Sequence, residues 1–333
     1  MKLQRLQLLT AMAVSAGVTL SAGLVLFSLS SHPASSQAAR TIKIVVPSPP
    51  GGAADTVARL LGAQIERSHA QTILIENRAG AGGMIAAEAV SRAAPDGNML
   101  LIMHPDALIP PHLRKLNFDL LDGFEHICEL VSAPVVIVVN GASAYRTLAD
   151  LIGVARARPG ELTLAAFGPA TSFQIAIERL KHAANVNMTY LPYSGAAPVV
   201  NALLGDHVTA GLITHSTASE HLNAGKLRAL ATTSRTRIEP LPDVPAIAEA
   251  GYKDAEMDDW WVGISAPAKT PKDRLSQLAD WFRSALESPD LKAKLAALGL
   301  YSVGICGTDF ARLLRKQYDE FGRVIREANV KAE

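Results

Sequence analysis

The sequence lacks an excess of charge of either sign. Its 32 lysines and arginines balance 31 aspartates and glutamates, so the formal net charge is +1. This balance gives no reason to expect a nucleic-acid partner, and no acidic run indicates a disordered tail. After residue 38 the chain has no run of 18 apolar residues, so we expect no membrane-spanning helix in the remainder.

The motifs of common catalytic and metal sites are also missing. The nine histidines include no HExxH motif and no pair separated by four residues. No G-x-S-x-G nucleophile elbow occurs, and the loop at Gly80 and Gly82 has Ile85 at the last glycine position of the dinucleotide motif. We therefore predict that the protein is not an enzyme and uses no metal or cofactor. The alternative is an exported hydrolase that uses Asp55 or His104.

The N-terminus has the pattern of an export signal. Lys2 and Arg5 precede an apolar segment, residues 8–29, and Ser36-Gln37-Ala38 resembles a cleavage site. We predict a signal peptide at residues 1–38 and a periplasmic location. Because the apolar segment is long, an uncleaved membrane anchor is the alternative.

Cysteine is scarce in this chain. Cys128 and Cys306 are its only two cysteines, and their spacing predicts no metal site. In an exported protein the two could form a disulfide. The interpretation we favour from the sequence is two separate buried thiols.

The most informative stretch that the sequence does contain is Ile42–Arg59. The β-branched residues at 42–46 predict a buried strand, which the prolines at 47, 49 and 50 end. Gly51 and Gly52 allow a ligand to approach the backbone, and the first N–H groups of the following helix can bind an anion. Asp55 in the first turn either caps the loop or orients a hydroxyl or amine of the ligand. The alternative for the whole stretch is an ordinary βα turn.

The same order of strand, small-residue loop and helix recurs along the chain. It precedes the helices that we expect at residues 84–94, 173–184 and 198–204. This alternation predicts an α/β fold with parallel sheets. Connections near residues 139–140 and 261–265 predict two crossings between two domains, which permit hinge closure over a ligand. The predicted domains are residues 39–140 with 264–333, and residues 141–263.

Two histidines and two tryptophans are further candidates for a binding cleft. His104 and His215 each follow a predicted strand at the carboxyl end of a sheet, where ligands of α/β proteins bind. Packing is the alternative for both histidines. Of Trp260 and Trp261 only one can face each side of its strand, and either lining of the cleft or packing at the hinge is consistent with the sequence.

Eight short motifs follow one another in order and cover nearly all of residues 41–330. They are Val46-Pro47-x-x-Pro50-Gly51-Gly52-x-x-Asp55-x-x-Ala58-Arg59, Glu76-Asn77-Arg78-x-Gly80-Ala81-Gly82-Gly83, Ala94-Pro95-Asp96-Gly97, Leu191-Pro192-Tyr193-x-Gly195, Gly225-Lys226-Leu227-Arg228-Ala229-Leu230-Ala231, Leu241-Pro242-Asp243-Val244-Pro245, Glu249-Ala250-Gly251-Tyr252 and Ala266-Pro267-x-x-Thr270-Pro271. Together they resemble the Bug family, the periplasmic solute-binding subunits of tripartite tricarboxylate transporters.

The resemblance implies a two-domain periplasmic binding protein, or venus flytrap, in which each domain is a mainly parallel sheet flanked by helices. It also implies that loops of both domains hold a ligand carboxylate in the cleft through backbone N–H groups and waters. Ser48 stands where the family commonly has an aromatic residue. With His104 added from the strand pattern, the candidate ligand-binding residues are Ser48, Gly51, Gly52, Ala53, Asp55, His104, Thr171, Ser172, Gly195, Ala196 and Ala197.

The function that follows from the resemblance is capture of a small carboxylate. The predicted partners are that ligand and the membrane permease subunits of a tripartite transporter, with the binding protein acting as a monomer. A second possibility is that the liganded form docks on the ectodomain of a sensor. The sequence does not indicate which carboxylate is bound.

Overall fold

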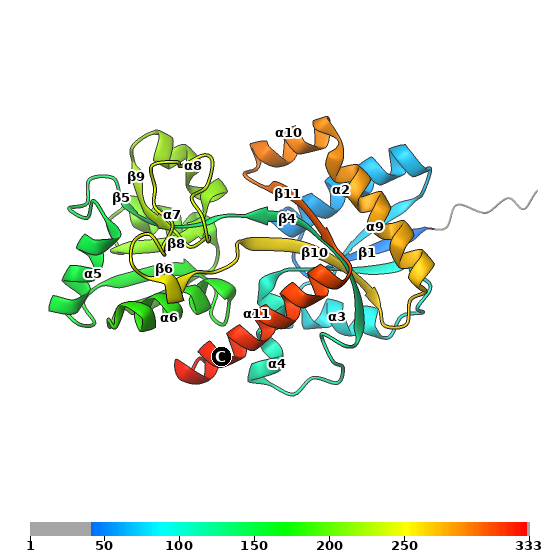
Figure 1. Cartoon of the computed structure of the whole chain (residues 1–333), viewed down its shortest axis with the longest axis horizontal. Coiled ribbons are helices and arrows are strands. Elements are labelled where there is room, and N and C mark those ends of the chain that lie inside the picture. The colour runs from blue at the N-terminus through cyan, green and yellow to red at the C-terminus, as the bar shows by residue number, and fades with distance from the viewer. Residues whose placement is uncertain (1–40, 332–333) are drawn as a thin grey trace, which may run out of the picture. The chain divides into compact units, whose positions relative to one another are not determined.

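The described part of the chain, residues 41–331, forms two β-sheets in this computed structural model (Figure 1). The predicted signal peptide, residues 1–38, lies outside it. The first sheet has the strand order β11-β4-β10-β3-β1-β2, and β10 and β11 run opposite to the other four strands. Its strands are β1 (Ile42–Val46), β2 (Ile73–Asn77), β3 (Met99–Met103), β4 (Phe124–Ala133), β10 (Trp260–Pro267) and β11 (Tyr301–Cys306).

The second sheet has the strand order β7-β6-β8-β5-β9, and β5 runs opposite to the other four. The sheets are thus mixed where the sequence pattern predicts mainly parallel pairing. The physical reason is that β5 and β10 each enter a sheet from the other one and pair antiparallel with their neighbours. The strands of the second sheet are β5 (Val135–Asn140), β6 (Thr163–Phe167), β7 (Thr189–Tyr193), β8 (Ala210–Thr214) and β9 (Leu227–Thr232).

Helices cover both faces of each sheet. On the first sheet, α3 and α11 share a core with one face, and α2, α9 and α10 with the other. On the second sheet, α5 and α6 pack on one face, and α7 and α8 on the other. Within residues 41–331, no helix is both long and apolar enough to cross a membrane. The helices are α2 (Ala53–His69), α3 (Met84–Ser91), α4 (Pro110–Leu113), α5 (Leu148–Ala157), α6 (Ser172–Ala184), α7 (Ala196–Leu204), α8 (His215–Asn223), α9 (Lys272–Glu287), α10 (Pro289–Ala297) and α11 (Thr308–Glu327), with short 3-10 turns η1 (Ala81–Gly83), η2 (Pro105–Leu108) and η3 (Lys253–Ala255).

Strand β5 shows why the chain folds with helices on two faces. Val135, Ile137 and Val139 belong to one buried cluster, and Val136 and Val138 belong to another. Alternate side chains of a strand point to opposite faces, so an unbroken apolar run is buried on both. The cluster around Val135 also contains side chains of the first sheet and its helices. One apolar core therefore continues from the first sheet into the second.

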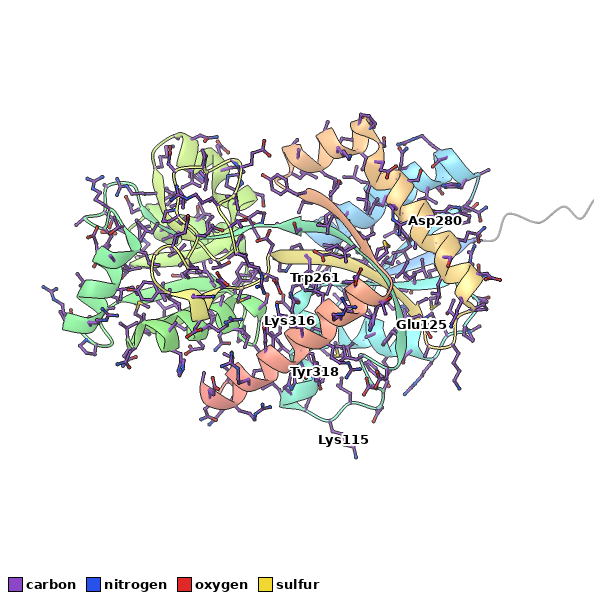
Figure 2. All side chains as sticks on the ribbon, in the orientation of Figure 1. Lys115, Glu125, Trp261, Asp280, Lys316 and Tyr318 are labelled. Atoms are coloured by element: carbon purple, nitrogen blue, oxygen red, sulfur yellow. A yellow bond between two sulfur atoms is a disulfide. The ribbon has the colours of Figure 1, made fainter. Side chains whose placement is uncertain are left out.

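The two tryptophans of β10 confirm the predicted alternation. Trp261 is fully buried, donates its Nε1–H to Gln317 of α11 at 2.8 Å, and packs edge-on against Phe310 (Figure 2). Trp260 points to the other side of the strand, where its ring stacks on His104 with 6.1 Å between ring centroids. Trp261 thus anchors α11 to the first sheet, whereas Trp260 contacts His104 on the opposite side of the strand.

The chain changes sheets at Pro134 and again before β10. Strand β5 pairs entirely within the second sheet and β10 pairs entirely within the first. The sequence pattern places these changes at residues 140 and 263, because it indicates the strands but not their partners. We therefore propose that the first domain ends at residue 133 and resumes at residue 260.

The two cysteines form a disulfide, so the interpretation of two separate thiols is wrong. Cys128 lies on β4 and Cys306 on β11, and the two residues are direct partners in the antiparallel register, with 4.0 Å between their Cα atoms. The sequence pattern indicated neither strand, so the two cysteines could not be placed side by side. The bond ties the edge strand β11 to the interior of the first sheet.

The disulfide predicts a large loss of stability when it is removed. It closes a loop of 178 residues, so a Cys128→Ser/Cys306→Ser variant should lose about 3–5 kcal/mol of unfolding free energy. Urea unfolding with and without reductant measures this. Reductant should destabilise the wild-type protein and leave the double variant unchanged. Equal unfolding of the wild-type protein in both conditions would contradict the bond's role.

Candidate functional site

The sequence-predicted site residues gather at the carboxyl ends of parallel strands. The loop after β1 and His104 after β3 share one edge of the first sheet, because these strands are parallel neighbours. The loops after β6 and β7 share one edge of the second sheet with His215 after β8. In open α/β sheets, ligands bind outside this edge.

Asp55 holds the shape of the loop between β1 and α2. Its Oδ2 accepts hydrogen bonds from the Gly51 N–H and the Arg59 Nε–H, and its Oδ1 accepts one from the Asn77 side-chain amide, all at 2.9 Å. The same Asn77 amide also donates to the Ser48 carbonyl at 3.0 Å. Of the two roles predicted for Asp55, this geometry matches the cap of the loop.

The charge of Asp55 is stabilised where it lies. Burial alone would raise the pKa of its carboxyl, but the hydrogen bonds from Arg59, Gly51 and Asn77 outweigh burial and hold the pKa at about 2. Gly51 has φ of +87°, a left-handed conformation that favours glycine. The carboxylate and the glycine together fix the path by which the chain enters α2.

The first turn of α2 has no side-chain cap. Gly52 is the N-cap residue and forms no side-chain hydrogen bond, and residues 51–53 are exposed. Ser48 Oγ lies next to this turn, 3.9 Å from where a Cβ on Gly52 would stand. Among the described residues, this buried hydroxyl has no hydrogen-bond partner. The N–H groups of the turn and the hydroxyl are therefore donors available to an anion.

The first turn of α7, a helix that packs on the second sheet, also lacks a side-chain cap. Gly195 is its N-cap residue in an extended conformation, and no side chain caps the turn formed by Ala196 and Ala197. Pro198 follows in the first turn, where its missing N–H costs no hydrogen bond. Gly195 and Ala196 are partly exposed and Ala197 is exposed. This helix N-terminus is a second set of backbone donors.

The first turn of α6 is different, because side chains of this protein occupy it. Thr171 Oγ1 accepts from the Gln174 N–H at 3.4 Å. Asp106 of η2 reaches across from the first sheet, and its Oδ1 accepts from the Ser172 N–H at 2.7 Å and from the Ser172 Oγ–H at 2.6 Å. The predicted ligand residues Thr171 and Ser172 thus have partners within the chain. These bonds also bring the two sheet edges together.

Three ring nitrogens lie buried near this contact or at the strand ends. His104 Nδ1 stands 3.5 Å from Asp106 Oδ2. In the described part of the chain, His215 Nδ1 and Trp260 Nε1 are buried without a hydrogen-bond partner. Burial lowers the pKa of His215, so its imidazole is neutral near pH 7. An indole N–H can only donate, so Trp260 is suited to an acceptor such as a carboxylate oxygen.

Three acidic side chains, Glu129, Asp258 and Asp259, lie close to one another near Trp260. Burial, together with the nearby charges of Asp258 and Asp259, raises the pKa of Glu129 on β4 to about 7. Asp259 accepts a hydrogen bond from the Ser234 hydroxyl at 2.5 Å, and burial raises its pKa as well. Asp258 pairs with Arg235 at 3.1 Å. Lys316 also pairs with Asp258, at 3.5 Å, so cations balance the charge of this carboxylate.

Asp106 is the residue that sequence reasoning missed. The available signal was an acidic residue three positions after the end of β3, at the sheet edge where His104 was already a candidate. The sequence could not indicate that Asp106 contacts the N-terminus of α6.

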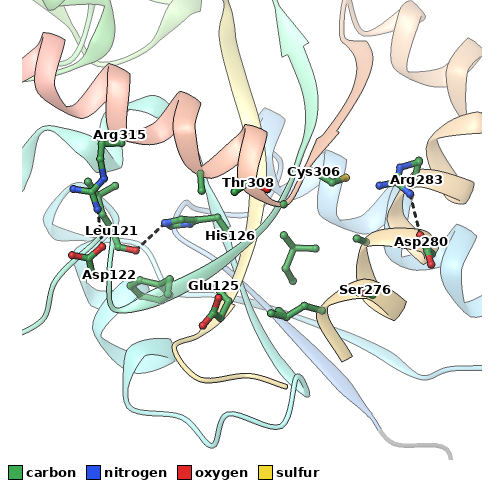
Figure 3. A pocket seen from close by; sticks show the side chains of 16 residues that line it. Leu121, Asp122, Glu125, His126, Ser276, Asp280, Arg283, Cys306, Thr308 and Arg315 are labelled. Carbon is green, nitrogen blue, oxygen red and sulfur yellow. Dashed lines mark hydrogen bonds and ion pairs between the residues drawn. The ribbon is translucent and has the colours of Figure 1, made fainter. Parts of the chain in front are cut away.

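Larger hollows elsewhere in the described residues do not include the predicted site. A cavity of about 640 Å³ lies between α9, the start of α11 and β4 (Figure 3). Four of its charged side chains form two pairs, Arg283 with Asp280 at 3.0 Å and Arg315 with Asp122 at 2.7 Å. Glu125 accepts a hydrogen bond from the Lys269 N–H at 3.2 Å. His126 is also satisfied, by the Leu121 carbonyl at 3.0 Å. Within residues 41–331, no three His, Cys, Asp or Glu side chains gather as metal ligands.

Two sheets joined by crossing strands, with donor groups at their carboxyl edges, define a two-domain solute-binding protein. A family model described as the tripartite tricarboxylate transporter family receptor, TctC, matches residues 57–330, and the chain belongs to this family. Protein BugT of Bordetella pertussis is 32% identical over 298 residues, which cover 88% of this chain and 90% of BugT.

Solved structures agree with this assignment. The periplasmic binding protein BugD is 30% identical with a TM-score of 0.73, and the match covers 88% of this chain and 99% of BugD. MatC of Rhodopseudomonas palustris with bound malate is 28% identical (TM-score 0.71; 86% and 99% covered). Rpa4515 of R. palustris with adipate is also 28% identical (TM-score 0.75; 88% and 98% covered). The Bug-type binding-protein fold and the prediction of a binding protein rather than an enzyme are confirmed.

Asp55 predicts a pH-dependent contribution to stability. Its pKa is lowered on folding from 3.8 to about 2, so its stabilisation is complete above pH 4 and is lost as the pH falls through 2. Relative to the wild-type protein, Asp55→Asn should lose about 2 kcal/mol at pH 6 and about half of that at pH 3. Urea unfolding at both pH values measures the difference. Exposed Asp243→Asn is the control and should change neither value; a pH-independent loss in Asp55→Asn would contradict the assignment.

Glu129 predicts the opposite pH dependence. Its pKa is raised on folding from 4.5 to about 7, so stability falls as the pH rises through this range, because the folded protein must release a proton from a buried site. Glu129→Gln should therefore gain about 2 kcal/mol relative to the wild-type protein between pH 5 and pH 8. Glu125→Gln, on the same strand, controls for the lost charge. If Glu129→Gln is no more stable than the wild-type protein at pH 8, the raised pKa of Glu129 is wrong.

Proposed function

We propose that this protein captures a small carboxylate between its two sheets and delivers it to the membrane permease subunits of a tripartite transporter. The observation that carries the proposal is the pair of uncapped helix N-termini, at α2 and α7, at the carboxyl edges of the two sheets. Each presents backbone N–H groups and the positive end of a helix dipole. An anion held by both would join the two domains.

The strength of such a site suits reversible capture. A hydrogen bond to a charged oxygen contributes about 1.5–3 kcal/mol. Three or four of them, from Gly52, Ala53, Ala196 and Ala197, support micromolar binding after the costs of ordering are subtracted. The unpartnered hydroxyl of Ser48 and the indole N–H of Trp260 add donors for further ligand atoms. His104 and Asp55 act in this proposal by shaping the site.

The related proteins support the ligand class. The solved relatives from Rhodopseudomonas palustris hold malate and adipate, both small carboxylates. The family description names a transporter receptor, and BugD is a periplasmic binding protein. With the predicted signal peptide at residues 1–38, these findings favour a protein that works in the periplasm. Its action as a monomer stays a prediction. Presentation of the ligand to a sensor stays a second prediction.

The proposal predicts ligand-dependent stabilisation that depends on the α2 N-terminus. The chain from residue 40 to 333, which is one compact unit, should melt at a higher temperature with at least one acid of a panel of mono-, di- and tricarboxylates. Gly52→Leu should weaken binding of that acid at least tenfold, because the side chain covers the turn. Thermal unfolding and isothermal titration calorimetry measure both effects.

The control is another exposed glycine. Gly153 on α5 has open space around it, so Gly153→Leu should bind as the wild-type protein does. Gly52 has backbone angles that any residue adopts, and its Cβ would meet only ordinary contacts, so Gly52→Leu should fold. Binding of no acid, or equal binding in the two leucine variants, would remove the proposed anion site.

A further inference from the structure

We propose that Asp106 makes this protein selective for ligands with one carboxylate, by filling the donor site of α6 with its own carboxylate. The inference rests on the proposed function and specifies its ligand class. Three of the helix N-termini at the strand ends carry predicted ligand residues; those of α2 and α7 lack a side-chain cap, whereas side chains occupy that of α6. The third is where a second ligand carboxylate would bind.

The contact of Asp106 with α6 has the geometry of a bound anion. One carboxylate oxygen accepts both the backbone N–H and the hydroxyl of Ser172, at 2.7 and 2.6 Å. The other oxygen lies 3.5 Å from His104 Nδ1. Ser172 is 3% exposed, and the Asp106 side chain is 12% exposed. A ligand carboxylate at this helix would make the same bonds, so the two compete for one place.

The negative charge of Asp106 strengthens its hydrogen bonds with Ser172 and so holds its side chain at the N-terminus of α6. Burial would raise the pKa of its carboxyl, but the neighbouring His104 and the two hydrogen bonds from Ser172 lower the pKa overall. The residue is therefore an anion at neutral pH. To displace it, a ligand would have to leave this carboxylate buried without its donors, which is costly.

The space beside the contact does not admit a second carboxylate. The hollow lined by Ser172, Trp260 and Asp259 has a volume of only about 10 Å³, which leaves room for no more than about one water molecule. Asp258 and Asp259 stand on its wall. Because Arg235 and Lys316 pair with Asp258, Asp259 is the carboxylate that would repel a second ligand carboxylate at close range. A ligand whose far end is uncharged meets no such repulsion and does not compete with Asp106 for the donors of α6. The near carboxylate still has the donors of α2 and α7.

Matched pairs of acids test the inference. Hexanoate and adipate share a six-carbon chain and differ by one carboxylate, as do butyrate and succinate with four carbons. In titration calorimetry of residues 40–333, the monocarboxylate of a pair should bind at least tenfold more tightly than its dicarboxylate. Asp106→Ser empties the α6 donor site, so the dicarboxylate should gain at least tenfold while the monocarboxylate changes less than threefold.

Two further variants separate selectivity from a purely structural contact. Asp106→Asn keeps an oxygen that accepts from Ser172, so it should still exclude the dicarboxylate. Adding Ser172→Ala to Asp106→Ser removes the hydroxyl donor of Ser172, so the double variant should lose most of the gain in dicarboxylate affinity. Circular dichroism and the melting temperature check that each variant folds. The preference of the wild-type protein for the monocarboxylate is a test that needs no variant.

The possible failures are distinguishable. If both acids of a pair bind the wild-type protein equally, or if Asp106→Ser changes both affinities by the same factor, the role of Asp106 is wrong and the carboxylate-binding function stands. If no acid of any pair binds the wild-type protein or Asp106→Ser, the proposed function fails and this inference fails with it.

Discussion

Backbone N–H groups in the first turn of a helix need an acceptor, and this requirement organises the region between the two sheets. At α6 the acceptor is the carboxylate of Asp106 from the other sheet. At α2 and α7 no side chain provides one. An occupied N-terminus joins the sheets, whereas an uncapped one is available to a ligand. The difference between the three helices therefore connects the fold to the proposed function.

The scaffold that holds these helices is continuous. One apolar cluster extends from Met103 of the first sheet to Ile137 of the second, and β5 and β10 enter their sheets antiparallel to the neighbouring strands. The Cys128–Cys306 disulfide fastens the edge strand β11 beside β4, the strand that leads into the crossing. Loops at the strand ends are thus carried by elements that are rigidly packed.

Much of this structure could be predicted from local patterns. The apolar run at residues 135–139 and the glycine loops before α2 and α7 indicated buried strands and helix starts, because each depends on neighbouring residues alone. The disulfide, the sheet membership of β5 and the contact of Asp106 with Ser172 depend on which strands become neighbours. Asp106 and Ser172 are 66 positions apart, so no periodic signal indicates their contact. The strands that bear the cysteines lacked a recognisable alternation.

The most direct test of the account is a backbone-amide NMR titration of residues 40–333 with hexanoate. The account predicts shifts of the amide signals of Gly52, Ala53, Ala196 and Ala197, because their N–H groups receive the carboxylate. The Ser172 amide should keep its position, since Asp106 already occupies it. A large shift of Ser172 with unchanged signals at Gly52 and Ala196 would contradict the account.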